Sequence, residues 1–421
     1  MVISAAKAEE QEEYVKSRVQ GNQRRHTLYC YARGAAYRQR RQGRLSRLPV
    51  TPALAQAATS KSLPVAHNRY LEAADHPSIF SNHSFCEHIV DLGEIRMNYA
   101  TAGTSDKPAL LLIPGQTESW WGYEVAMHLL QDSYQVFAVD MRGQGRSTWT
   151  PGRYSLDNFG SDLVRFIDTV IQRPVIVSGL SSGGVMSAWL SAFAKPGQIR
   201  ASIYEDPPLF ASQAKPAVGQ SVMQTAAGPF FKLWYRWLGG QWSIGDETGM
   251  YAHLKDEIPA WILQYLGNST GPNGLSVNLP EYDPEWGNGF VSGTIDAACD
   301  HETILTHVKT PVLFTHHLRA IDPTTGNLLG SVSDTQVQYA QDLIAVNGNQ
   351  SFTLEQFPKQ PHDMHSSDPV TYVTAITKWI SSIGMGEALV PNSTQVSSIS
   401  AKISAASTAP PTCTSTAASK L

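Results

Sequence analysis

The sequence predicts a protein of the α/β class, with a mostly parallel central sheet, helices on both faces and an inserted cap. Three observations lead to this fold class. Several short runs are continuously apolar, segments of helix length separate them, and a tryptophan-rich stretch interrupts the alternation. Continuous apolar runs are typical of strands that are buried on both faces of a parallel sheet. A chain of 421 residues is long enough to bury such a core.

Regular patterning begins near residue 85, and the first half of the sheet is expected soon after it. Residues 88–100 read as a pair of short strands. Residues 156–171 carry apolar side chains at helical spacing, which predicts an amphipathic helix between two strands. The buried strands that we expect in this half are residues 109–113, 134–139 and 174–178.

The alternation breaks at about residue 211 and resumes at about residue 300. Five tryptophans and many glycines and prolines fall in residues 211–300, which we interpret as a cap inserted over the sheet. The sheet then continues with strands at residues 311–315 and 352–357. A closing helix is expected at residues 370–380.

The two ends of the chain differ in composition from the predicted α/β domain at residues 85–384. Residues 1–84 are rich in arginine and poor in large aliphatic side chains, so we expect a poorly ordered extension. Residues 385–421 are dominated by serine, threonine and alanine, which cannot bury enough apolar surface to fold, so we expect a disordered tail. The net charge of −4 gives no reason to expect a nucleic acid partner, and no apolar run is long enough for a membrane span.

The strongest chemical signal is a GxSxG pattern, Gly-Leu-Ser-Ser-Gly at residues 179–183. It directly follows a predicted buried strand, and residues 185–194 after it read as a helix. Glycines at these two positions permit the tight turn that exposes a serine at the end of a strand. A hydroxyl becomes an effective nucleophile when a base, an orienting acid and oxyanion donors surround it. We therefore expect Ser181 to be a catalytic nucleophile.

Two backbone N–H groups are candidates for the oxyanion hole. Ser182 follows the nucleophile at the start of the expected helix, and Gln116 lies in the loop after the strand at residues 109–113. One such donor is worth about 10²–10³ in rate. We expect both N–H groups to hold the negative oxygen that forms when the serine attacks a carbonyl.

Among the 13 histidines, His362 is the expected general base. It lies in the loop between the last strand and the last helix, where the chain order serine, acid, histidine places the base. His365 is the alternative, three residues later. His316 and His317 lie at a strand end and are interpreted as pocket or structural residues.

Three carboxylates could orient the histidine. Glu205 and Asp206 follow the strand after the nucleophile helix, and Asp322 follows the next strand. Either strand end suits an acid that supports a histidine. A carboxylate at 205 or 206 could also cap the turn before Pro207 and Pro208. The residues alone leave the choice open.

Residues 85–384 resemble the α/β-hydrolase superfamily. Three motifs match in order, and His362 follows them late in the chain: Pro-Gly at 114–115, DxRGxGxS at 140–147 and GxSxG at 179–183. Many members have His-Gly in place of the Pro-Gly pair, a departure that leaves a backbone oxyanion hole intact. The resemblance implies an α/β-hydrolase fold with a cap. We expect the charges of the second motif to serve the fold.

The resemblance also bears on the acid and on the chemistry. In branches similar to haloalkane dehalogenases and resorcylate lactone hydrolases, the acid follows the nucleophile by 24 residues, which is Glu205 here. Residues 362–369 also resemble the lactone-hydrolase branch. Glu205 is therefore favoured over Asp322. Dehalogenases and epoxide hydrolases use a carboxylate nucleophile, so the serine at position 181 argues against their chemistry.

The chain ends in Ser419-Lys420-Leu421, a tripeptide that is read by the peroxisomal import receptor. A flexible tail presents such a tripeptide to a receptor groove, so we expect a peroxisomal location with this receptor as a partner. An α/β-hydrolase with this ending is similar to the peroxisomal hydrolases of fungal host-selective-toxin clusters. That similarity implies a place in secondary metabolism.

The expected function is that of a serine hydrolase that cleaves a carboxylic ester, thioester or lactone of a small acyl compound through an acyl-enzyme. Ser181 attacks the carbonyl and His362 takes its proton, while Glu205 orients the histidine. The N–H groups of Gln116 and Ser182 hold the oxyanion. We expect no cofactor and no metal ion. Two alternatives stay open, namely an acyltransferase that passes the same acyl group to an alcohol, and a non-catalytic subunit that uses the fold for binding.

Overall fold

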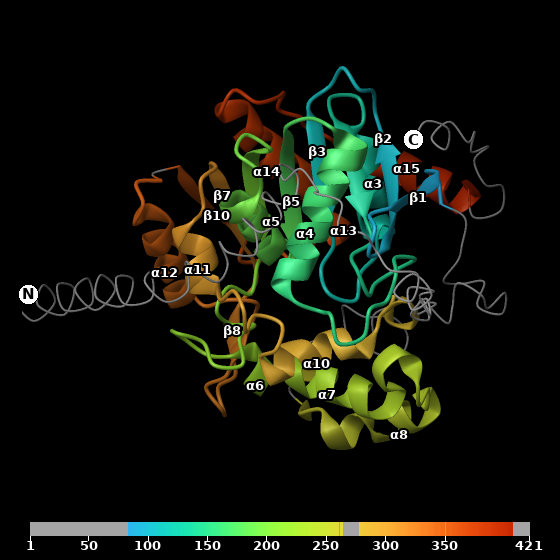
Figure 1. Ribbon diagram of the computed structural model, residues 1–421, viewed down its shortest axis with the longest axis vertical. Coiled ribbons are helices and arrows are strands. Elements are labelled where there is room, and N and C mark those ends of the chain that lie inside the picture. The colour runs from blue at the N-terminus through green and yellow to red at the C-terminus, as the bar shows by residue number, and fades with distance from the viewer. Residues whose placement is uncertain (1–82, 261, 264–277, 350, 407–421) are drawn as a thin grey trace, which may run out of the picture.

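A computed structural model of the chain describes residues 83–260, 262–263, 278–349 and 351–406 (Figure 1). A central sheet stands between layers of helices, and a separate group of helices lies below it in this view. The arginine-rich extension, apart from its last two residues, and the final tripeptide lie outside the described residues. Within the described ranges, the helices are too short or too polar to cross a bilayer.

The central sheet has eight strands and is mostly parallel, as the sequence predicts. Its strands are β1 (Glu87–Asp91), β2 (Arg96–Ala102), β3 (Ala109–Ile113), β4 (Gln135–Val139), β5 (Val175–Leu180), β6 (Ile199–Glu205), β7 (Val312–His316) and β10 (Phe352–Gln356). Their order across the sheet is β1-β2-β4-β3-β5-β6-β7-β10. The pairs β1–β2 and β2–β4 are antiparallel, and the remaining neighbours are parallel.

Side chains alternate between the two faces along the buried strands. On β3, Leu110 and Leu112 belong to one hydrophobic cluster, whereas Leu111 and Ile113 belong to the other. All four side chains are fully buried. The period of two sends neighbouring residues to opposite faces, so a strand covered on both sides must be apolar at every position. This double cover explains the continuous apolar runs in the sequence.

Two sets of helices provide this cover. The first face packs against α3 (Glu124–Leu130) and α14 (Pro369–Ser382). The second face packs against α4 (Leu156–Phe166), α5 (Ser182–Phe193), α11 (His301–Thr306) and α12 (Asp334–Ala345). Shorter elements are η1 (Trp120–Tyr123), η2 (Ile167–Ile171), α13 (Met364–Ser367) and the hairpin of β8 (Ala320–Ile321) with β9 (Leu328–Leu329).

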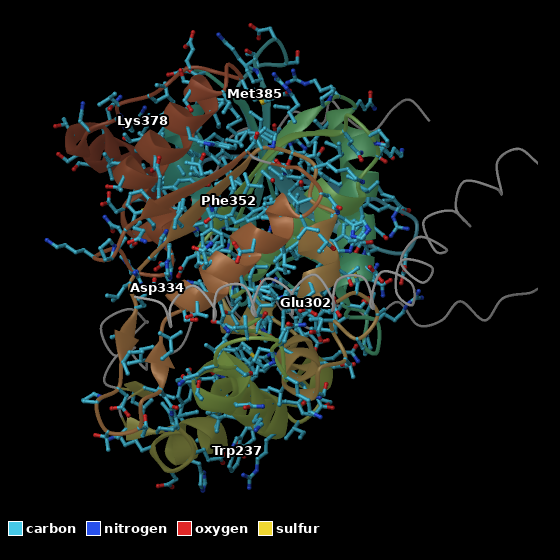
Figure 2. The ribbon with its side chains drawn as sticks, turned by 90° about the vertical axis from the view of Figure 1, so that its left-hand side faces the viewer. Trp237, Glu302, Asp334, Phe352, Lys378 and Met385 are labelled. Carbon is cyan, nitrogen blue, oxygen red and sulfur yellow. The ribbon has the colours of Figure 1, made fainter. Side chains whose placement is uncertain are left out.

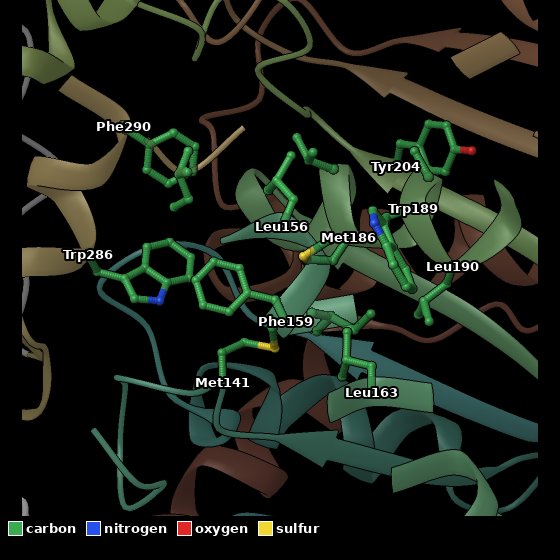
Figure 3. Close-up of a cluster of buried hydrophobic side chains, with 14 of the residues drawn as sticks. Met141, Leu156, Phe159, Leu163, Met186, Trp189, Leu190, Tyr204, Trp286 and Phe290 are labelled. Carbon is green, nitrogen blue, oxygen red and sulfur yellow. The ribbon is translucent and has the colours of Figure 1, made fainter. Parts of the chain in front are cut away.

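The cap predicted at residues 211–300 appears as a group of helices between β6 and α11. Its described elements are α6 (Val222–Thr225), α7 (Ala227–Leu238), η3 (Gly240–Trp242), α8 (Glu247–Glu257), η4 (Leu279–Glu281) and α10 (Pro284–Ser292). Trp286 of α10 stacks on Phe159 of α4, with ring centroids 4.6 Å apart (Figure 3). In Figure 2 the cap carries Trp237 at one end of the molecule, and Met385 lies at the other end. A buried aromatic contact therefore joins the cap to the sheet domain.

The C-terminal segment corrects the sequence prediction in part. Residues 393–406, expected to be disordered, form helix α15 (Ser393–Ala406), which packs against α3 and α14. Val396, Ile399 and Ile403 recur at helical spacing, and Ile399 is buried. This narrow apolar stripe gives the segment a face to bury in spite of its serine-rich composition.

Candidate active site

Ser181 stands in a sharp turn between β5 and α5. Its backbone is in a left-handed region that non-glycine residues rarely adopt, with φ 54° and ψ −121°. A Cβ atom on Gly179 would collide with the carbonyl oxygen of Gly183, and one on Gly183 would collide with that of Ile113. The two glycines of the motif are therefore required by close backbone contacts. The strand, turn and helix that the sequence predicts around Ser181 are confirmed.

The backbone of Ser181 ties the nucleophile to the neighbouring strand. Its N–H donates to the carbonyl oxygen of Glu205 at 2.8 Å, and its own carbonyl accepts from Gly184 at 2.9 Å. Ser182 is the first residue of α5, where N–H groups have no acceptor within the helix. Gln116 follows β3, which pairs with β5 through Ile113 and Gly179. Both expected oxyanion donors thus lie at the edge of the sheet that carries Ser181.

The acid beside His362 is Asp206, and the expectation of Glu205 is corrected. Asp206 Oδ2 lies 2.7 Å from His362 Nδ1. Asp206 directly follows Glu205, which pairs with Leu180 in the sheet, so the acid that contacts His362 lies at the strand end next to Ser181. Asp322 accepts hydrogen bonds from the N–H groups of Thr324 and Thr325, and so caps its own turn. Asp322 is therefore not the partner of His362.

His317 holds the acid and the base together, a role that the sequence did not reveal. The backbone N–H of His317 donates to Asp206 Oδ1 at 3.1 Å. Its ring Nδ1 lies 2.8 Å from the carbonyl oxygen of Pro361, so Nδ1 carries a proton and donates. Its Nε2 lies 2.9 Å from the Thr315 hydroxyl. The ring is fully buried, and its position at the end of β7 was the only signal in the sequence.

The Asp206–His362 pair is polarised in the direction that general-base catalysis needs. Desolvation lowers the pKa of His362, but the hydrogen bond and charge of Asp206 raise this pKa by more. Burial raises the pKa of Asp206, and the hydrogen bond and charge of His362 outweigh it, so this pKa is lowered. The pair therefore favours an ionised acid beside a histidine of increased basicity.

Glu205 supports the other histidine of the same loop. Its Oε1 accepts from the backbone N–H of His365 at 2.8 Å, and both of its carboxylate oxygens lie 3.2 Å from His365 Nδ1. Both side chains are fully buried. On the far side of the ring, Nε2 lies 3.9 Å from Glu118 Oε2. Glu118 in turn accepts from the N–H of Gly115 at 3.0 Å.

Burial and neighbouring charges shift the pKa values of His365 and Glu118. Desolvation lowers the pKa of His365, but the charge and hydrogen bond of Glu205, followed by the charge of Glu118, raise it to about 9. Burial raises the pKa of Glu118, although the charge of His365 opposes the rise. His365 is thus expected to be an imidazolium at neutral pH. A buried imidazolium is a poor proton acceptor, and His362, in the loop between β10 and α13, keeps the chain position of the base.

The cap touches the oxyanion loop, which we define as residues 114–119. The side-chain amide of Gln116 donates to the hydroxyl of Tyr282 in a short hydrogen bond. The Ser119 hydroxyl donates to Glu281 Oε2 at 2.6 Å and accepts from Asn278 at 3.0 Å. Burial, followed by the nearby charge of Asp140, raises the pKa of Glu281 to about 8. Glu281 is therefore expected to be a neutral acid at pH 7.

The DxRGxGxS motif serves the fold, as the sequence predicts. Asp140 accepts from the N–H groups of Trp120 and Arg146 and from the side chain of Asn98. Arg142 pairs with Asp162 of α4 at 2.7 Å, and both side chains are fully buried. The bonds of Asp140 fix the turn after β4 against the start of η1, and the pair of Arg142 with Asp162 fixes this turn against α4. In the described ranges, no group of three histidine, cysteine, aspartate or glutamate side chains is arranged to hold a metal ion.

Comparison with known proteins points to one fold family. A sequence profile of the alpha/beta hydrolase fold family matches residues 108–241, which contain all three motifs. The chain is similar to 3-oxoadipate enol-lactonase 2 of Acinetobacter baylyi, with 34% identity over 23% of this chain and 37% of the relative. It is also similar to human epoxide hydrolase 4, with 31% identity over 30% of this chain and 36% of the relative. The chain therefore matches only about a third of the length of these relatives.

Solved structures extend the similarity to most of the described chain. The enol-lactonase of Burkholderia xenovorans superposes with a TM-score of 0.51 and 15% identity over 70% of this chain and 100% of that chain. An esterase from a Rhodococcus species superposes with a TM-score of 0.51 and 20% identity over 72% of this chain and 100% of that one. At this identity the superpositions concern the fold alone. Together with the sheet order and the profile match, they show that this chain has the alpha/beta hydrolase fold.

Proposed function

We propose that this protein is a serine hydrolase that cleaves a carboxylic ester, thioester or lactone through an acyl-enzyme. The observation that carries the proposal is the pairing of His362 with Asp206, an acid that directly follows the strand end beside Ser181. A strained turn presents the serine hydroxyl, and a buried carboxylate fixes the histidine ring. This is the arrangement of nucleophile, base and orienting acid that acyl transfer requires.

The reaction begins with attack of the Ser181 hydroxyl on the acyl carbon. Because Nδ1 of His362 is bonded to Asp206, Nε2 is the nitrogen that takes the hydroxyl proton. The new C–O bond pushes an electron pair onto the carbonyl oxygen, which the N–H groups of Ser182 and Gln116 hold. The electron pair then returns and expels the alkoxide or thiolate, which takes the proton from His362. Water next attacks the acyl-enzyme in the same way, and Ser181 leaves with its proton restored.

A carboxylate nucleophile of the epoxide-hydrolase kind is not proposed. The chain is similar to epoxide hydrolases in sequence, but a serine stands in the strained turn between β5 and α5. A hydroxyl at this position forms an ester with the acyl group of a substrate. The relative named as an enol-lactonase fits the lactone class proposed here.

An acyltransferase is the second candidate function. It would use the same acyl-enzyme and release it to an alcohol in place of water. Addition of a short alcohol during turnover separates the two candidates. Formation of an alkyl ester at the expense of the free acid would establish acyl transfer.

Location and pathway are also proposals. The ending Ser419-Lys420-Leu421 supports import into peroxisomes by the receptor that reads this tripeptide. The similarity of such an enzyme to hydrolases of fungal toxin clusters supports a place in secondary metabolism. Both rest on sequence, since the tripeptide lies outside the described residues.

The direct functional test uses a chromogenic short-chain ester. Wild type should show a rapid burst of the leaving group followed by slower turnover, because an activated ester acylates the serine faster than water hydrolyses the acyl-enzyme. Ser181→Ala should lose the burst and about 10³-fold or more of kcat. Ser182→Ala is the matched control, because it keeps the backbone N–H that the mechanism uses. A folded wild type without turnover on short and long acyl esters would favour a non-catalytic binding role.

A further inference from the structure

A buried ionic group lies behind the nucleophile and takes no part in the proposed proton transfers. It consists of Glu205, His365 and Glu118. The carboxylate of Glu205 and the ring of His365 are fully shielded from solvent. Removing charges from water is costly unless they are paired and hydrogen bonded. The contacts of these three side chains indicate which parts of the site the group holds in place.

Each member of the group is fixed to a different loop of the site. Glu118 belongs to the oxyanion loop and accepts from its Gly115 N–H at 3.0 Å. Glu205 ends β6, and its carbonyl oxygen accepts from the N–H of Ser181 at 2.8 Å. His365 belongs to the loop that carries His362, three residues earlier. The oxyanion loop, the turn that holds Ser181 and the loop that carries His362 therefore meet at the imidazole of His365.

The imidazole itself has little room to move. The ring of Tyr123 stacks on it, with centroids 3.9 Å apart and planes 25° from parallel. The Tyr123 hydroxyl donates to the carbonyl of Ile113, the last residue before the oxyanion loop, at 3.1 Å. A Cβ atom on Gly122 would make an ordinary contact of 3.6 Å with Nε2, so this edge of the ring faces the backbone of Gly122. Displacement of the ring would thus disturb the entry to the oxyanion loop.

We propose that Glu118, His365 and Glu205 form a positioning bridge that fixes the oxyanion loop and the base loop relative to Ser181. The bridge rests on the proposed hydrolase function, for which these loops supply the donors and the base. Its members transfer no proton and bind no reacting atom in the proposed mechanism, so they are positioning residues. The ring of His365 lies between two carboxylates: Nδ1 is 3.2 Å from Glu205, and Nε2 is 3.9 Å from Glu118, an ion-pair separation without a hydrogen bond.

Loss of the bridge should slow the chemical step more than it weakens binding. A displacement of the oxyanion loop by a fraction of an ångström lengthens bonds that form only as the oxyanion develops. A misplacement of about 1 Å can cost on the order of 10²-fold in rate. We therefore expect kcat to fall about 10- to 100-fold and KM to stay within about twofold.

The first test reads the charge on His365 without any turnover. Nitrogen-15 NMR of Ser181→Ala at neutral pH should show a histidine with both ring nitrogens protonated, and this signal should vanish in the Ser181→Ala/His365→Gln double variant. Glu205, Glu118 and Asp363 are the acidic groups that act on this ring, and Tyr123 and Tyr372 flank it. A neutral ring at this position would overturn the bridge. This test holds even if the protein proves not to be a hydrolase.

The second test compares two changes at Glu118. Glu118→Gln keeps an oxygen that can accept from Gly115, whereas Glu118→Ala removes it. Turnover of the chromogenic ester should fall about 10- to 100-fold in kcat for Glu118→Ala, with KM nearly unchanged, and Glu118→Gln should recover much of the loss. Wild-type kcat in Glu118→Ala would overturn the bridge. Absence of turnover in wild type itself would instead count against the proposed function.

A matched control separates positioning from general loss of stability. Asp162→Asn breaks the buried pair with Arg142 on α4, outside the three loops. Breaking a buried pair costs about 3–5 kcal/mol of stability. Asp162→Asn should therefore lower the unfolding temperature and keep the kcat of the folded enzyme. An equal loss of kcat in Asp162→Asn and Glu118→Ala would contradict a specific positioning role.

Discussion

Glu205 and Asp206 are neighbours in the sequence, yet they support two different histidines. Glu205 is the last residue of β6 and keeps the strand alternation, which directs its carboxylate to His365. Asp206 leaves the strand with φ 41°, and its carboxylate reaches His362. A shift of one residue changes the face on which a strand side chain lies. The spacing from Ser181 located this pair of residues but could not tell which one left the strand.

Replacement of the acid should change both the rate and its pH dependence. Asp206→Asn is expected to lower kcat/KM by about 10²–10⁴. Because Asp206 raises the pKa of His362, its loss lowers that pKa, and the acid limb of the pH–rate profile should move to lower pH. Initial rates across the pH range measure both effects.

Asp322→Asn is the matched control for the acid. Asp322 caps the turn at Thr324 and Thr325, so this variant should keep the profile of wild type. A larger loss in Asp322→Asn than in Asp206→Asn would restore the alternative that sequence reasoning left open. An unshifted acid limb in Asp206→Asn would show that Asp206 does not act on the base.

At the scale of elements, the buried strands were the most predictable part of the chain. The run at residues 109–113 matches β3 in both bounds, and the run at 352–357 exceeds β10 by one residue. Continuous burial leaves a clear apolar signal because both faces must be covered. Helix α15 was missed because its stabilisation comes from packing on α3 and α14, which composition does not show.

The segment that joins the cap to the oxyanion loop should make stability depend on pH. The folded-state pKa of Glu281 is raised from 4.5 to about 8, so its contribution is fully present below pH 4.5 and is lost as pH rises through about 8. The free energy of unfolding should fall by a few kcal/mol across this window. Glu281→Gln imitates the neutral acid and should flatten the fall, as measured by urea unfolding at several pH values.

Glu257→Gln provides the comparison for this titration. Glu257 lies on the cap helix α8 and pairs with the exposed Arg236. Its replacement should leave the slope of unfolding free energy against pH as in wild type. Parallel slopes in wild type and Glu281→Gln would show that Glu281 is ionised in the folded protein.

His365 should also lower the free energy of unfolding from about pH 6.5 upwards, because its folded-state pKa is raised to about 9.

At the scale of the whole molecule, the sheet domain and its site form one unit with the cap. Trp286 packs on Phe159, and Tyr282 bonds to Gln116, so cap residues touch both the core and the oxyanion loop. The sequence located the cap by its tryptophans but could not define these contacts. Contacts between segments far apart in the chain depend on tertiary packing, which local patterns do not encode.

The final tripeptide should direct location without affecting catalysis. Removal of Ser419-Lys420-Leu421 is expected to leave esterase activity unchanged, because the proposed site lies in the sheet domain. In cells, a fluorescent protein fused before residue 1 should enter peroxisomes with the intact chain and stay in the cytosol without the tripeptide. Import of the shortened chain would contradict the proposed address.

The central claim is that Ser181 forms a covalent bond with the acyl group, and mass spectrometry of the labelled protein tests it most directly. A fluorophosphonate probe should modify wild type once, and the digest should place the adduct on Ser181. Ser181→Ala should stay unmodified under the same conditions, and Asp206→Asn should react more slowly than wild type. An adduct on another residue, or equal labelling of Ser181→Ala and wild type, would contradict the assignment.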